Sequence, residues 1–144
     1  MGRAHYKHGH NAGTIGCFGA AAAAAEILGL EQQKFAHALA TVATFAAGLQ
    51  QAFRMDSMSK PLHAGRAAEA GVTAALACAE GVTGSLNLLE GAAGLARARR
   101  HGPDRAKSVE TRGRAFQLTH VPLKNTAGRG TPLHPARHTP HPTD

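Results

Sequence analysis

The 144-residue sequence has few of the residues that mark disulfide-rich, metal-binding or membrane proteins. Its two cysteines, Cys17 and Cys78, lie far apart in alanine-rich surroundings, which excludes a disulfide framework and a Cys-x-x-Cys zinc pattern. Two cysteines are also too few for an iron–sulfur cluster. The apolar run from Ala12 to Ala25 is too short to span a bilayer, and residues 1–11 are polar, unlike a signal peptide. We therefore expect a cytoplasmic protein that contacts no membrane and needs no metal or cofactor.

Aromatic residues are also scarce, and the positive charge is confined to one end of the chain. Residues 1–96 hold equal numbers of basic and acidic residues, so residues 97–144 supply the whole formal charge of +7. A basic segment of this kind binds phosphate backbones weakly and in a salt-sensitive way. Phe116 is its only aromatic residue, whereas single-strand binding would need several stacking side chains. The composition argues against specific nucleic-acid recognition.

The pattern of apolar and small residues predicts an all-α domain over residues 1–96. Gly29 and Gly81 stand where helices are expected to stop, and Ser85 is a suitable cap for a short final helix. The predicted helices cover residues 14–28, 31–49, 62–79 and 86–90. Residues 50–59 are predicted to be a loop.

The expected core consists of the larger apolar residues of these helices. In the second predicted helix they recur at spacings of three and four, which is typical of a core-facing stripe. That stripe comprises Phe35, Leu39, Val42, Phe45 and Leu49. His37 falls outside it and is expected at the rim or surface. In the third predicted helix the related positions are Leu62, Ala68, Val72, Ala75, Leu76 and Ala79.

The regular pattern ends after Gly91. Residues 97–125 are predicted to be a junction toward a second lobe, with one short strand over residues 116–123 that Pro122 restricts to a sheet edge or strand end. Residues 126–144 have no period and almost no apolar residue, so they are predicted to be disordered. The abrupt change to Pro, Arg and His after Asn125 is typical of a frame change in the coding sequence.

A lysine and a histidine stand three residues apart at the start of the third predicted helix. Pro61 suits a first helical position, and Ser59 is expected to cap the helix. Lys60 and His63 then lie at a helix N-terminus, where free N–H groups and the helix dipole favour anions. This combination predicts a site for a small carboxylate, although the same residues also fit an ordinary helix start at the surface.

Three segments of the chain resemble the MmgE/PrpD family. The first begins Gly-His-Asn-Ala-Gly-Thr-Ile-Gly and spans residues 9–23; the second contains Ser-Lys-Pro-Leu-His-Ala-Gly-Arg and spans residues 58–71. The third reads Phe-Gln-Leu-Thr-His-Val-Pro-Leu-Lys-Asn and spans residues 116–125. This family includes 2-methylcitrate dehydratase, cis-aconitate decarboxylase and iminodisuccinate epimerase. The resemblance implies a cofactor-independent lyase, or an epimerase, acting on a small di- or tricarboxylate.

The resemblance also implies which residues form the site. His10 matches the family's active-site histidine, although Asn11 replaces the usual proline, and Lys60 matches its substrate-contacting lysine. We expect these two catalytic residues to meet in space. His63 and Lys124 are expected to bind substrate, with Lys124 closing over it from the second lobe. A purely structural role for His10 or Lys124 remains an alternative.

In the family, a longer helical segment precedes the region of His10, and a complete second lobe follows. The resemblance therefore implies an internal fragment of the helical domain, which we expect to be inactive alone. The competing hypothesis is a non-catalytic helical module. Its small-residue faces at Gly16, Gly19, Gly65 and Gly71 would pack against a second copy, since the family's helical lobes form homodimers.

Overall fold

The computed structural model of the chain describes residues 3–55, 57–99 and 109–115. The chain divides into two compact units, Met1–Pro103 and Asp104–Asp144. The helices of the first unit are α1 (Arg3–Tyr6), α2 (Asn11–Thr14), α3 (Gly16–Ile27), α4 (Gln32–Phe45), the 3-10 helix η1 (Gln50–Phe53), α5 (Leu62–Ala79) and α6 (Leu95–Arg99). In the second unit, residues 110–114 form turns. The described residues contain no β-strand, in agreement with the predicted all-α class.

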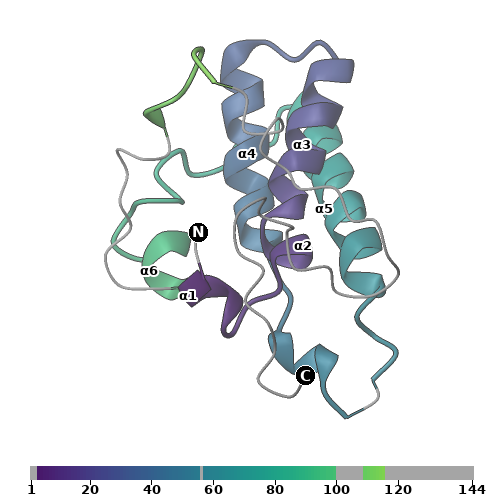
Figure 1. Ribbon diagram of the computed structural model, residues 1–144. Coiled ribbons are helices and arrows are strands. Elements are labelled where there is room, and N and C mark those ends of the chain that lie inside the picture. The colour runs from purple at the N-terminus through teal and green to yellow at the C-terminus, as the bar shows by residue number, and fades with distance from the viewer. Residues whose placement is uncertain (1–2, 56, 100–108, 116–144) are drawn as a thin grey trace. The chain divides into compact units, whose positions relative to one another are not determined.

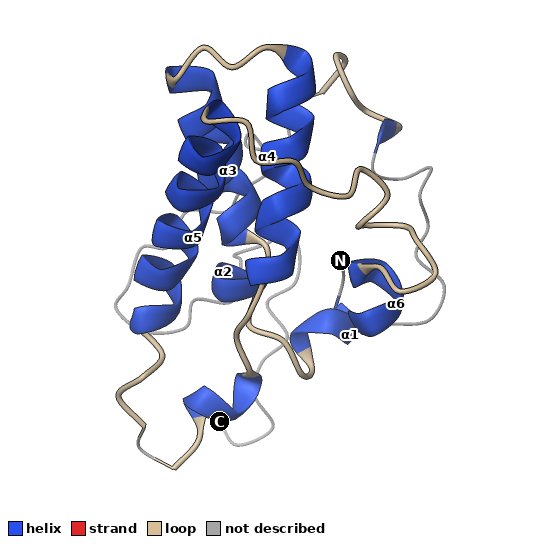
Figure 2. Cartoon of the chain, turned by 180° about the vertical axis from the view of Figure 1, so that it is seen from behind, coloured by secondary structure: helices blue, strands red, loops and turns tan. Residues whose placement is uncertain are grey.

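Three helices, α3, α4 and α5, pack against one another to form the body of the first unit (Figure 1). Gly29 has a φ of +63° in the turn that ends α3, so the chain reverses and α4 runs antiparallel to α3. The helix α5 runs alongside α3 in the same direction. This is shown by two contacts, in which Ala67 faces Gly16 and Gly71 faces Ala20. Figure 2 shows the same three helices from behind, with η1 below their lower end.

The core between these helices is built from small side chains. The largest fully buried side chains are Val42, Thr14, Cys17 and Cys78. Because alanine and cysteine add little width, the helix backbones approach closely. The central buried cluster comprises Cys17, Ala21, Val42, Ala46, Ala67, Ala70 and Ala74, with Phe18, Leu39 and Leu95 packed partly against it. Both cysteines are buried, and neither forms a disulfide.

The predicted apolar stripe of the second helix was wrong as a description of the core. Of its five residues only Val42 is buried, whereas Phe45 and Leu49 are exposed. The core is already filled by alanines of α3 and α5, which leaves no room for large side chains. Moreover, α4 ends at Phe45 rather than at residue 49, because Ala46 is extended and Gly48 adopts a φ of +138°.

The third predicted helix has the bounds of α5, and Gly81 follows it with a φ of +97°. Of the six residues predicted on its inner face, only Ala75 is buried. Leu62, Val72 and Leu76 are exposed, and the helix instead buries its smallest side chains. The buried residues are Ala67, Ala70, Gly71, Ala74, Ala75 and Cys78. Small residues therefore mark the inside of this bundle.

Other local predictions also need correction. The first predicted helix corresponds to α3, which begins at Gly16 rather than at residue 14, and the separate short helix α2 precedes it. Residues 86–90 form turns rather than a helix, since the Ser85 hydroxyl donates to the Asn87 side chain instead of capping (2.7 Å). The Ser59 hydroxyl bonds Ser57 and does not cap α5.

His37, which lies outside the predicted core stripe, joins α4 to the loop that follows α5. His37 is half-buried, and its Nδ1 donates to the Gly84 carbonyl (3.0 Å).

The strand predicted over residues 116–123 and the disorder predicted over residues 126–144 lie outside the described residues. The predicted domain limits at residues 96 and 125 stay predictions. No helix among the described residues has the length and apolar content needed to cross a bilayer.

Candidate functional site

The backbone of His10 is held between two segments that are distant in the sequence. His10 precedes α2 in an extended conformation (φ −89°, ψ 115°), and its N–H donates to the Gly48 carbonyl (3.1 Å). Beside this contact, Gly9 forms an isolated antiparallel bridge with Leu49. The His10 carbonyl accepts the N–H groups of Gly13 and Thr14 at the start of α2 (3.0 Å each). Both polar backbone groups of His10 are therefore hydrogen-bonded. These bonds fix the position of the backbone from which the imidazole side chain extends.

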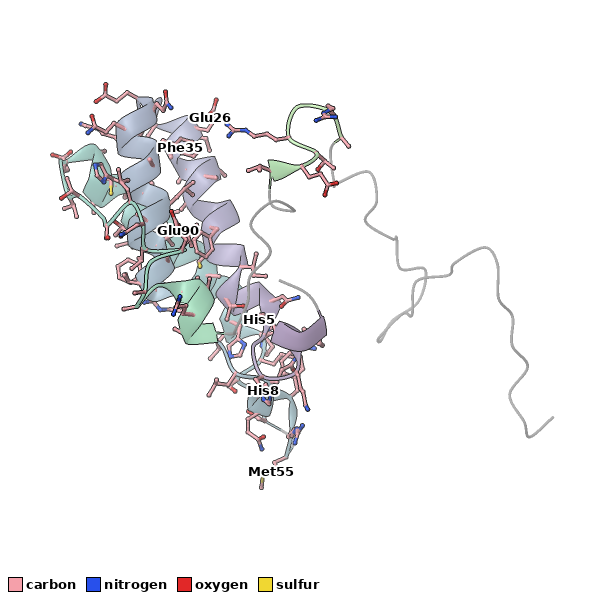
Figure 3. The ribbon with its side chains drawn as sticks, turned by 90° about the vertical axis from the view of Figure 1, so that its left-hand side faces the viewer. His5, His8, Glu26, Phe35, Met55 and Glu90 are labelled. Atoms are coloured by element: carbon pink, nitrogen blue, oxygen red, sulfur yellow. The ribbon has the colours of Figure 1, made fainter. Side chains whose placement is uncertain are left out.

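A buried hydrogen-bond chain supports the same residue. The Thr14 hydroxyl donates to the His10 carbonyl (3.0 Å) and lies 2.8 Å from Nε2 of His5. A hydroxyl has one hydrogen to donate, so it must accept from His5, whose Nε2 carries a hydrogen. Both His5 and Thr14 are buried. Figure 3 shows His5 and His8 toward the end of the bundle where Met55 lies, opposite Glu26 and Phe35.

The His5 ring lies against Gly9 and occupies the space that a side chain at this position would need. A Cβ at Gly9 would stand 2.5 Å from Cε1 and 2.6 Å from Nε2 of His5. We expect Gly9→Ala to destabilise the protein by about 1–3 kcal/mol through overpacking. In a His5→Ala background the same substitution should cost much less, because the obstructing ring is gone. Urea denaturation of the four proteins in this double-mutant cycle measures the coupling. Equal costs of Gly9→Ala in both backgrounds would contradict it.

The imidazoles of His10 and His63 meet directly. Their Nδ1 atoms are 2.7 Å apart, although the residues are 53 positions apart, and both rings are half-buried. His63 lies in the first turn of α5, and its Nδ1 stands over Gly48, where a Cβ would be 3.4 Å away. Gly48 thus contacts both members of the pair: it accepts the backbone N–H of His10 and leaves room for the ring of His63.

Phe53 places Lys60 beside the same pair. The Lys60 Nζ lies 4.6 Å from the centroid of the Phe53 ring, within the range of a cation–π interaction. The His10 ring packs edge-on against the same phenyl ring, with centroids 4.5 Å apart and planes at 83°. One aromatic ring of η1 therefore contacts the ammonium group and the imidazole that the sequence predicts to be catalytic.

The electrostatic environment favours a neutral His10. Burial lowers the pKa of His10 below its ordinary value of 6.5, and the positive charges of His63 and Lys60 lower it further. The described segments that build the site, residues 5–14, 48–55 and 57–63, contain no aspartate or glutamate; Asp56, which stands between the last two segments, lies outside the described residues. The charged side chains of these segments at neutral pH are Lys7, Arg54 and Lys60. The segments thus combine a proton-accepting imidazole with a cationic surface.

This pKa shift has a consequence for stability. Since the folded protein holds the His10 proton less tightly than the unfolded chain, the unfolded chain binds more protons below pH 6.5. The contribution of His10 is therefore present above pH 6.5 and is lost as the pH falls toward its folded pKa. We expect the free energy of unfolding to fall more steeply between about pH 7.5 and 5.5 in the wild type than in His10→Gln. Urea denaturation at each pH checks this, and parallel curves would contradict it.

The structure brings together three of the four predicted site residues. His10 contacts both His63 and Phe53, and the Lys60 ammonium lies over the same phenyl ring, whereas Lys124 lies outside the described residues. Phe53, His5 and Thr14 were not predicted as site residues. Phe53 lies in a segment that was predicted to be a loop. The only sequence feature that pointed to a role for Phe53 was the scarcity of aromatic residues in this chain. Among the described residues, no group of three or more His, Cys, Asp or Glu side chains is arranged to hold a metal ion.

Comparison with known proteins agrees with the sequence resemblance. No curated protein matches the chain. A family model, described as the MmgE/PrpD N-terminal domain, matches residues 1–107, which include every residue of the site built above. The match covers more than half of the chain, and the helical fold of the first unit is consistent with it. The chain therefore belongs to the MmgE/PrpD family, and its residues 1–107 match the N-terminal domain of that family.

Proposed function

We propose that this domain binds a small di- or tricarboxylate against Lys60, His10 and His63 and takes part in moving a proton next to one of its carboxylates. The observation that supports the proposal is the convergence on Phe53 of an ammonium group and an imidazole from segments 50 residues apart in the chain. An ammonium group supplies charge-assisted hydrogen bonds to a carboxylate. It also stabilises the negative charge that develops when a neighbouring carbon loses its proton.

The proposed base is His10. Its lowered pKa keeps the imidazole unprotonated near neutral pH, so that its lone pair is available to accept a proton. Lys60 stays beside it as the cation that holds the substrate. The reaction class is that of a cofactor-independent lyase, a dehydratase or decarboxylase acting on acids such as 2-methylcitrate or cis-aconitate. Closure by Lys124, a cytoplasmic location and a homodimeric state remain parts of this proposal.

A non-catalytic interaction module is the second candidate. Gly71 and Gly16 do not support it, because they face Ala20 and Ala67 within the chain. Gly19 and Gly65, in contrast, have nothing within 4 Å of where a Cβ would stand. Leu62, Val72 and Leu76 of α5 are also exposed. These two open glycines and the apolar surface of α5 are what a second copy of the chain would cover.

Calorimetric titration of the full chain with cis-aconitate, 2-methylcitrate and acetate, beside a light-scattering measurement of mass, separates the candidates. The carboxylate proposal expects saturable binding of the two tricarboxylates, and much weaker binding of acetate, which offers one charge. Absence of tricarboxylate binding from a folded, specific dimer would overturn it and favour the module. Turnover of either acid, followed in the same samples, would contradict the expectation that the chain alone is inactive.

A further inference from the structure

The direct contact between two Nδ1 atoms restricts how protons are distributed over His10 and His63. At 2.7 Å the two nitrogens share one hydrogen, so one ring donates from Nδ1 and the other accepts there. In the neutral pair, the donating ring has a lone pair on Nε2, and the accepting ring carries its hydrogen on Nε2. The pair therefore offers one proton acceptor and one proton donor at the same time.

We propose that His10 and His63 act as a single proton relay, in which a proton accepted at Nε2 of one ring leaves from Nε2 of the other. This inference rests on the proposed function, because a dehydratase or an epimerase must both remove a proton from carbon and deliver one. It assigns His63 a role in proton transfer in addition to the substrate contact expected from the sequence.

The protons balance in three steps. First, Nε2 of His10 takes the proton from the carbon next to a carboxylate, and the electron pair of that C–H bond stays on the substrate. Second, the shared hydrogen moves from Nδ1 of His10 to Nδ1 of His63, which carries the positive charge across the pair. Third, Nε2 of His63 releases its hydrogen to the leaving group or to the opposite face of the carbon. Both rings end neutral with their tautomers exchanged, and water at these half-buried rings restores the starting state.

The surroundings hold this geometry and limit the charge on the pair. The His10 backbone is fixed by Gly48 and Thr14, and the His63 N–H donates to the Lys60 carbonyl (3.2 Å) in the first turn of α5. The Lys60 ammonium and the Phe53 ring are the other groups found around His10. With a lysine charge nearby, protonation of both rings at once is unfavourable, and it would also place a hydrogen on each Nδ1 and break the contact between them. One shared hydrogen is the state that a relay requires.

Nitrogen-15 NMR of the histidine-labelled, ligand-free chain tests the relay without any need for turnover. The relay predicts a coupling between the two Nδ1 nuclei across their hydrogen bond. It also predicts Nε2 shifts at both rings between the values for protonated and unprotonated nitrogen, because the tautomers interchange. Absence of the coupling, or two rings fixed in single tautomers, would overturn the relay while leaving carboxylate binding untouched.

A variant separates proton transfer from simple positioning. In His63→Asn, an amide stands where Nδ1 was and keeps a hydrogen bond to His10, but no ring can pass a proton on. We expect exchange of the substrate's carboxylate-adjacent hydrogen with deuterium from solvent, measured at saturating acid so that any loss of binding does not enter the rate, to slow about 100-fold. His63→Ala should be equally slow. Rescue of exchange by asparagine would reduce His63 to a positioning residue and overturn the relay. If the wild type binds the acid but exchanges no hydrogen, the proposed reaction fails, and the NMR measurement alone decides the relay.

Discussion

Replacing Lys60 with methionine is expected to weaken tricarboxylate binding by about 10- to 100-fold, because a charge-assisted hydrogen bond contributes about 1.5–3 kcal/mol. Methionine keeps most of the apolar stem that reaches the Phe53 ring and removes only the ammonium group. The same substitution should raise the pKa of His10, since the Lys60 charge is one of the causes that lower it. Calorimetry measures the first effect, and an NMR pH titration of His10 measures the second.

Lys34→Met is the matched control for this substitution. It removes the same charge at the opposite end of α5, where the Lys34 ammonium donates to the Ala79 carbonyl (2.7 Å). The helix places that end far beyond the screening length of about 8–10 Å at physiological salt. We expect some loss of stability but no change in tricarboxylate affinity or in the pKa of His10. Equal losses of affinity in the two variants would show that binding depends on net charge rather than on this site.

Gly71→Ala is expected to destabilise the fold by about 1–3 kcal/mol, although alanine normally strengthens a helix. A Cβ at this position would stand 2.5 Å from the backbone nitrogen of Ala21 and 2.7 Å from the carbonyl carbon of Ala20. These are backbone atoms of α3, so they cannot move aside as the end of a flexible side chain would. The helices α3 and α5 would have to separate along the face that forms most of the core.

Gly65→Ala, two turns earlier in the same helix, is the matched control. Nothing lies within 4 Å of where its Cβ would stand. We expect this variant to be more stable than the wild type by up to about 1 kcal/mol, because the unfolded chain loses conformational freedom. Urea denaturation of both variants gives the two signs. Stabilisation by both substitutions would mean that α3 and α5 are not in close contact at Gly71.

The sequence was sufficient to predict α5 and the helix stops but not the arrangement of the core. Residues 62–79 were predicted with the correct bounds, and Gly29 and Gly81 adopt the positive φ expected of helix ends. Most residues of the predicted inner faces, other than Val42 and Ala75, are not buried, because apolar periodicity assumes that the larger side chains lie inside. In a bundle with alanine at most contact positions, the close approach of backbones excludes residues such as Val72 and Leu76.

The end of α4 could not be predicted from the local sequence, because it depends on a contact with a distant part of the chain. The apolar spacing continued to Leu49, but the segment after Phe45 is extended because Gly48 accepts the N–H of His10. That contact joins residues 38 positions apart, and it also builds the site. The meeting of His10 with Lys60 was expected from the family resemblance. Phe53, which contacts both, could be found only once the fold was known.

The carboxylate site is tested most directly by NMR of the full chain with labelled histidine and lysine, titrated with cis-aconitate at about 0.15 M salt, where weak binding to exposed basic segments is screened. We predict that the resonances of His10, His63 and Lys60 shift together along one saturable curve, while histidines of residues 97–144 do not respond. Shifts confined to residues 97–144, or responses of His10 and Lys60 at different concentrations, would contradict a shared site.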